Sequence, residues 1–304
     1  MKSETSHGNT GARNSVQCGS SRGVWGCLAV LAVIAPLAHC ARPASLPHEP
    51  ASTTPVAISP NAHDPPFATN PYEPCSRSSV VGIALREWRL FGQLVDDYPP
   101  RPRLASDAQP QRLPGLWQRV GEYWWLGIAG DPRRSLWTGK HGATGLEFPA
   151  SDDDEYAWSA AFISYVMRIA GAGPRFPYSS YHADFIDVAK EMRLGQTSGW
   201  LITAERPSDY APQPGDLICL GRGRAASLTY DSLPAPRFPA HCDIVTRTQP
   251  GQIEVIGGNV DAAVTMKHVP VTPDGKLATP DGRVLDTRYP WLVVLKVAYP
   301  DAAS

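Results

Sequence analysis

Helical and strand patterns are segregated along this chain, and that segregation constrains the fold more than any other feature. Apolar residues recur at helical spacing in the first part of the sequence, whereas short alternating runs separated by Gly and Pro turns fill the last part. The pattern predicts helices at residues 78–97, 116–128, 159–170 and 180–194, and strands at 215–220, 239–246, 252–259, 263–271 and 291–297. Helices first and an antiparallel sheet second predict an α+β domain.

The segment Glu155-Tyr-Ala-Trp-Ser-Ala-Ala-Phe-Ile-Ser-Tyr-Val-Met-Arg168 places Ser159 at the start of a buried helix that Gly171 stops. Unpaired N–H groups of a first helical turn can stabilise a developing anion, so a nucleophile would be helped there. Ser is also a preferred helix-capping residue. Both interpretations of Ser159 stay open on this segment alone.

Two later strands supply partners for a nucleophile. His241 stands at the entrance of the strand at 239–246, and Asn259 ends the strand at 252–259. A helix-borne nucleophile, then a strand-borne His, then a polar residue that orients the ring is the order in papain-like hydrolases. The order Ser159, His241, Asn259 therefore predicts a catalytic site, with the Ser159 N–H as oxyanion donor.

The motifs Trp158-Ser-Ala-Ala-Phe, Pro214-Gly-Asp-Leu, His241-Cys-Asp-Ile-Val and Gly257-Gly-Asn resemble the layout of bacterial cell-wall CHAP-type amidases and endopeptidases. The stretches 158–168, Phe176-Pro-Tyr-Ser-Ser-Tyr-His182 and 241–259 resemble more closely the bacterial family called domain of unknown function 2272, and that resemblance covers residues 120–297. The resemblance implies a papain-like core of N-terminal helices packed on an antiparallel sheet, and cleavage of an amide in peptidoglycan or a related peptide.

Ser159 stands where CHAP-type enzymes have Cys. A His–Asn pair does not ionise a serine, so His241 would have to act as general base during attack. Two hypotheses therefore stay open: a serine-dependent hydrolase, and a catalytically silent module that binds peptidoglycan or an envelope protein through the same cleft.

Three further residues are candidates for the cleft. Trp158 precedes the nucleophile position, and His182 opens the helix at 180–194. Asp243 is a rival to Asn259 for orienting His241, but two places along one strand we expect it to be poorly placed for the far ring nitrogen. Residues 221–240, irregular and rich in Pro and Arg, are predicted to form a lid or specificity loop.

The first 40 residues carry a targeting pattern, with Arg13 and Arg22 ahead of a short apolar run. Leu37-Ala-His-Cys resembles a lipoprotein signal in which Cys40 would be lipidated; ordinary cleavage near Ala41 and an uncleaved anchor are the alternatives. Residues 41–77, rich in Pro, Ala, Ser and Thr, are predicted to be a flexible tether, and 78–300 the folded domain. These features predict an exported, periplasmic or membrane-anchored protein of a bacterial envelope.

A formal net charge of −1 points to neither nucleic acid nor an acidic membrane surface as partner. No Cys and His spacing is typical of a zinc site and no phosphate-binding Gly loop is present, so neither a metal nor a cofactor is predicted. Cys219 and Cys242 lie on strands expected to be neighbours, where a disulfide can form. Residues 200–212 are predicted to be loop, and Asp152 to Asp154 a solvated approach to the central helix.

Overall fold

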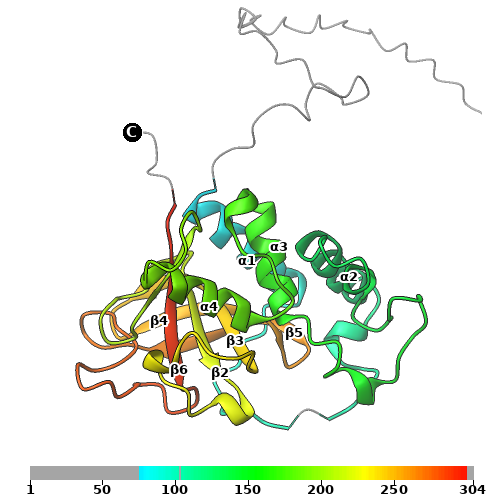
Figure 1. Cartoon of the computed structure of the whole chain (residues 1–304). Helices are drawn as coiled ribbons and strands as arrows, with labels where there is room; N and C mark the ends of the chain where they lie inside the picture. Colours follow the sequence, from blue (N-terminus) through cyan, green and yellow to red (C-terminus); the bar gives the residue numbers. More distant parts are fainter. Residues whose placement is uncertain (1–74, 103, 300–304) are drawn as a thin grey trace, which may run out of the picture. The chain divides into compact units, whose positions relative to one another are not determined.

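The computed structural model describes residues 75–102 and 104–299. Within them the protein has four α-helices followed by an antiparallel sheet of six strands, one more than the five predicted, and the predicted α+β class is confirmed (Figure 1). The helices are α1 (Arg77–Leu90), α2 (Leu116–Gly127), α3 (Ser159–Ile169) and α4 (His182–Arg193). The strands are β1 (Ile202–Glu205), β2 (Leu217–Gly221), β3 (Ala240–Gln249), β4 (Gln252–Val260), β5 (Ala263–Pro270) and β6 (Trp291–Val297).

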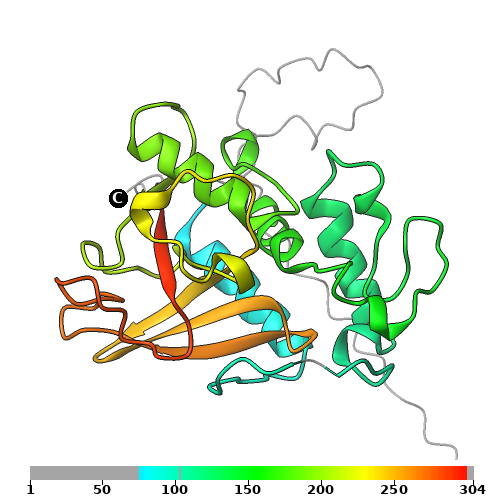
Figure 2. The same ribbon diagram turned by 60° about the horizontal axis from the view of Figure 1, so that its bottom comes forward.

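The strand order is β1-β6-β2-β3-β4-β5, and every pair is antiparallel. In Figure 2 the paired strands β4 and β5, in orange, form a long hairpin at one edge of the sheet. Strand β1, at the other edge, lies where the sequence predicted loop. Strand β1 has only four residues, and it pairs with β6, which follows about ninety positions later in the chain. No local sequence pattern therefore predicts it.

Helices α1, α3 and α4 pack on one face of the sheet and α2 packs against α3; the larger core includes side chains from all four (Figure 1). Gly258 of β4 lets α3 approach closely, because a Cβ there would lie 2.6 Å from Phe162 Cβ and 2.8 Å from Trp158 Cζ3. The opposite face carries a second core in which side chains of residues 271–291 cover the strands. The central helix α3 is thus fixed directly against the sheet.

Helix α1 ends earlier than the residues at 78–97 predicted. It stops at Leu90 because the chain turns through positive φ at Gly92 and Gln93. Val95 then forms a parallel bridge with Met266, and Leu94 O accepts a hydrogen bond from Met266 N at 3.0 Å. The apolar residues that seemed to extend the helix therefore run along the free edge of β5.

A buried carboxylate joins the first three helices. Glu87 of α1 is fully buried and accepts hydrogen bonds from Arg119 Nε of α2 at 2.6 Å and from the Tyr123 hydroxyl at 2.7 Å. Burial alone would raise the pKa of Glu87, but these hydrogen bonds and the Arg119 charge hold it below its usual range. A second hydroxyl, from Tyr165 of α3, donates to the same carboxylate at 3.4 Å.

Strands β2 and β3 are also linked covalently. Cys219 and Cys242 are directly paired in the register and form a disulfide, as their positions predicted. Both sulfur atoms lie on the face of the sheet that carries the helices. The disulfide therefore ties together the two central strands beneath the start of β3.

The predicted leader at 1–40, with Cys40, and the tether up to residue 74 lie outside the described residues. Helix α1 begins at Arg77, the last position of the predicted tether, and Ser76 caps it. Within residues 75–102 and 104–299, no helix has the length and hydropathy needed to cross a membrane.

Candidate functional site

Ser159 is the first residue of α3 and not its cap. Trp158 occupies the N-cap position and makes no side-chain capping bond, while the Ser159 hydroxyl lies 2.8 Å from His182 Nε2. Trp158 itself is 1% exposed and donates its indole N–H to Gln111 Oε1 at 2.8 Å. Trp158 is therefore a core residue, which corrects its prediction as a cleft residue.

His182, predicted as a cleft residue that opens the helix at 180–194, is the first residue of α4. The structure buries it: His182 is 5% exposed, and its Nδ1 has no hydrogen-bond partner among the described residues. Burial, with the nearby His241, lowers the pKa of His182 well below 6.5. The ring is therefore neutral at pH 7, and in the tautomer protonated at Nδ1 its Nε2 accepts the Ser159 proton.

His241 belongs to a separate buried array. Its Nε2 lies 2.9 Å from Asp243 Oδ1, and Asp243 Oδ2 lies 2.7 Å from Lys267 Nζ. Burial alone would raise the pKa of Asp243, but the charges of Lys267 and His241 hold it well below 3.8. Burial lowers the pKa of His241 below 6.5, and the Asp243 carboxylate opposes that shift. Since Asp243 is ionised, His241 Nε2–H is the donor in this pair.

The expectation that Asp243 would be poorly placed for the far ring nitrogen was wrong, since it lies 2.9 Å from His241 Nε2. Alternate residues of a strand share a face, so the side chains of His241 and Asp243 extend on the same side of β3 and their tips meet. Gly257 of β4 provides the room, because a Cβ there would lie 1.9 Å from Asp243 Oδ1 and 2.8 Å from His241 Nε2. Lys267 was not predicted, although a Lys within the apolar run of residues 263–271 was a usable signal.

The serine–histidine pair and the His241 array meet edge to face. The rings of His182 and His241 have centroids 5.3 Å apart at an interplanar angle of 64°. Ser159 was expected to face His241, but its hydroxyl contacts His182 instead. Asn259, at a φ of 58°, borders the same cavity as His241, while Asp243 holds the ring nitrogen that Asn259 was expected to orient.

Two cavities open beside these side chains. Ser159 and His182 line one of about 680 Å³, and His241 and Asn259 line another of about 530 Å³. Arg222 lines both, and it lies in the segment 221–240 that was predicted to be a lid or specificity loop. The loop after β2 thus borders the site on both sides.

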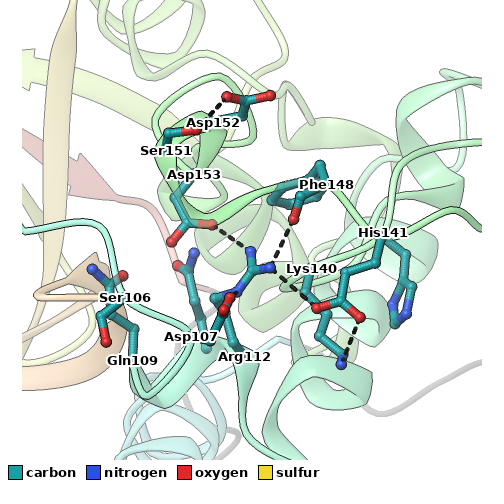
Figure 3. A network of polar contacts seen from close by, with 12 residues as sticks. Ser106, Asp107, Gln109, Arg112, Lys140, His141, Phe148, Ser151, Asp152 and Asp153 are labelled. Carbon is teal, nitrogen blue, oxygen red and sulfur yellow. Dashed lines mark hydrogen bonds and ion pairs between the residues drawn. The ribbon is translucent and has the colours of Figure 1, made fainter. Parts of the chain in front are cut away.

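The approach to α3 is anchored by a buried arginine (Figure 3). Arg112 is 4% exposed and donates to Asp153 Oδ1 at 2.8 Å and to the Phe148 carbonyl at 2.7 Å. It also contacts the exposed carboxylates of Asp107 at 3.0 Å and Glu147 at 3.2 Å. The acidic run before α3 is therefore not wholly solvated as predicted, since Asp153 fixes the segment that leads to Ser159.

Metal chemistry has no candidate centre in the part of the chain that the structure describes. No group of three or more His, Cys, Asp or Glu side chains there is placed to hold an ion. What the arrangement can supply is a hydroxyl, a neutral imidazole and the N–H groups of a helix start.

Comparison with known proteins identifies a family but no characterised relative. The chain significantly matches no curated protein and no solved structure. A family model matches residues 111–297, more than half of the chain, and spans Ser159, His182, His241, Asp243 and Lys267. The protein thus belongs to the family described as "uncharacterized protein conserved in bacteria", domain of unknown function 2272.

Proposed function

We propose that this protein is a serine-dependent hydrolase of amide bonds in peptide substrates. The observation that carries the proposal is the 2.8 Å contact between Ser159 Oγ and His182 Nε2 at the start of α3, on the wall of a cavity. A nucleophile and a base within hydrogen-bond reach are the minimum that acyl transfer needs.

The chemistry follows from the two side chains. His182 Nε2 takes the Ser159 proton as Oγ attacks the scissile carbonyl carbon, and the same nitrogen then gives that proton to the leaving amine. Water, deprotonated by His182 in turn, hydrolyses the acyl-serine. The N–H groups of the first turn of α3, which no side chain caps, are available to the oxyanion.

The His241 array has an electrostatic part in this proposal. The pKa of His182 is lowered by burial and by His241, whereas the buried Asp243 carboxylate raises it. Asp243 therefore favours the imidazolium that forms on His182 during attack. Asn259, predicted to orient His241, borders the neighbouring cavity and is proposed only as a substrate contact.

Peptidoglycan in a bacterial envelope is the proposed substrate. The proposal is supported by the motif resemblance to CHAP-type amidases, by the helix-start position of Ser159 against an antiparallel sheet, and by the export pattern of the first 40 residues. It includes a papain-like arrangement of the core, with serine in place of cysteine.

Digestion of purified peptidoglycan by the protein, followed by mass spectrometry, tests this function. We expect new peptide products from the native protein, none from Ser159→Ala, and unchanged products from Ser208→Ala, a partly buried serine that lines neither cavity beside the site and donates its hydroxyl to Asp209. Products that persist in Ser159→Ala would remove Ser159 from the mechanism.

One observation favours a second function, a silent module that binds peptidoglycan without cleaving it. His182 Nδ1 is buried without a partner among the described residues, so no third group orients the ring. Under that function the native protein yields no products, and Ser159→Cys, which restores the more acidic nucleophile, yields them. Silence from both would reject peptidoglycan as a substrate of this site.

A further inference from the structure

Two opposite charges stand where the two cavities adjoin. Asp154, from the segment before α3, and Arg222, from the loop after β2, each line both the Ser159 cavity and the His241 cavity. Both side chains are exposed. Within the described part of the chain neither one has an ion-pair partner, and they do not pair with each other although they border the same space.

Four other charges around the two cavities are already paired. Arg134 pairs with Asp131 at 2.9 Å and Lys267 with Asp243 at 2.7 Å. In the same way Arg237 lies 3.7 Å from Asp184, and Arg288 lies 2.9 Å from Asp286. Asp154 and Arg222 have no such ion pair in the described structure, and they are the charged residues that line both cavities.

Arg222 is also close to both histidines. Its positive charge contributes to lowering the pKa of His182 and that of His241. Because Arg222 and Ser159 line the same cavity, a ligand group held by the guanidinium would lie in the cavity that Ser159 borders. Arg224 and Glu155, by contrast, line only the Ser159 cavity.

We propose that the cleft selects a zwitterionic peptide, with Arg222 binding a free carboxylate and Asp154 a free ammonium on either side of the bond to be cleaved. The inference rests on the proposed function, since it names the substrate class for the same site. A guanidinium holds a carboxylate through two parallel hydrogen bonds, and a carboxylate accepts from an ammonium. A neutral peptide of the same length would leave both charges without a counterpart.

Binding to the Ser159→Ala protein separates recognition from turnover. The probe is a tetrapeptide stem released from peptidoglycan, used in three forms: unmodified, with carboxyl groups amidated, and with amino groups acetylated. Isothermal titration calorimetry gives the dissociation constant of each form. We expect the unmodified form to bind at least ~10-fold more tightly than either modified form, because each modification removes one charge-assisted contact.

Two variants assign the contacts. In the Ser159→Ala background, Arg222→Gln should weaken the unmodified peptide by ~10-fold and leave the amidated peptide unchanged, since its carboxylates are gone already. Asp154→Asn should weaken binding of the unmodified peptide by ~10-fold and leave binding of the acetylated peptide unchanged, since its ammonium groups are gone already. The matched controls Arg224→Gln and Glu155→Gln, which line one cavity only, should have smaller effects on all three forms.

The outcomes distinguish this inference from the proposed function. Tight binding of the unmodified peptide with the expected variant pattern, but no cleavage by the native protein, supports the inference and rejects the hydrolase. Cleavage by the native protein with equal affinity for all three forms, or with no effect of Arg222→Gln and Asp154→Asn, overturns the inference alone. Absence of both binding and cleavage overturns both.

Discussion

The two histidines of the site are neighbours, yet the protein treats them in opposite ways. His182 contacts one uncharged partner, the Ser159 hydroxyl, and its other nitrogen is buried without a partner in the described structure. His241 is held by an ionised carboxylate that is itself held by Lys267. Both rings are almost completely buried.

This difference between His182 and His241 shows how a general base and a fixed buried charge can lie within a few ångströms of each other in separate roles. A neutral imidazole with a hydroxyl at Nε2 is free to gain and lose a proton. The His241 imidazole, in contrast, is fixed in orientation, because its Nε2–H donates a hydrogen bond to the Asp243 carboxylate. His182 is accordingly the candidate base, and the His241 array is its electrostatic support.

The sharpest way to break the comparison is to remove each ring in turn. We expect His182→Gln to lower kcat by ~10²–10⁴-fold, the usual contribution of a general base. His241→Gln should lower it by only about tenfold, since it disturbs a neighbouring charge and not the proton acceptor. Steady-state kinetics on a peptidoglycan fragment measure both. A larger loss in His241→Gln would restore His241 as the base that the sequence predicted.

The buried charges that hold His241 can be tested at Lys267. Lys267→Met leaves Asp243 buried without its cation, and we expect the free energy of unfolding to fall by ~3–5 kcal/mol in urea denaturation. Lys276→Met, which breaks a partly exposed pair with Asp274, is the matched control and should change the free energy of unfolding by less than about 1 kcal/mol. The double variant Lys267→Met with Asp243→Asn should recover part of the loss; if it does not, the charge of Asp243 is not the cause.

The space beneath the array can be tested at Gly257. An added Cβ would collide with Asp243 and His241, so Gly257→Ala should destabilise the protein by ~1–3 kcal/mol. Gly82→Ala is the control: it lies in the exposed interior of α1 with no atom within 4 Å of the added Cβ, and it should stabilise by about 1 kcal/mol. Thermal unfolding of the two variants compares them, and equal effects would contradict a close approach at Gly257.

The smallest effect concerns pH. The pKa of His182 is lowered in the folded state, so the unfolded chain binds a proton at His182 below about pH 6.5 while the folded protein does not. The free energy of unfolding should therefore fall as the pH drops below about 6.5, by at most ~1.4 kcal/mol per pH unit from this residue. The stability of His182→Gln should depend less steeply on pH between 6.5 and 5. An unchanged slope would show that His182 is not buried in its neutral form.

Much of the frame was predictable because it rests on local periodicity. The bounds of α2 and α3 follow from apolar residues at helical spacing, and the end of α3 also follows from Gly171. Five of the six strands follow from short apolar runs between turns. The neighbouring positions of Cys219 and Cys242 on β2 and β3 followed from the same strands. The resemblance to the family also came from short motifs of neighbouring residues.

The contacts between the residues of the site could not be predicted from local periodicity. Ser159 and His182 are 23 positions apart on two helices, and only the packing of α3 and α4 decided that the hydroxyl meets this ring and not that of His241. The approach of Lys267 to Asp243 needed the register of three strands and the absence of a side chain at Gly257.

The sequence by itself thus determined that a side chain able to act as a nucleophile, Ser159, lies at the start of a helix in an α+β protein of this family. Only the tertiary structure decided which imidazole the nucleophile contacts and which buried charges pair. It also decided that α1 ends before Val95, which pairs with the edge of β5 instead. The physical reason is range: helix and strand periods are set by neighbours along the chain, whereas hydrogen-bond partners in a core are set by packing between elements distant in sequence.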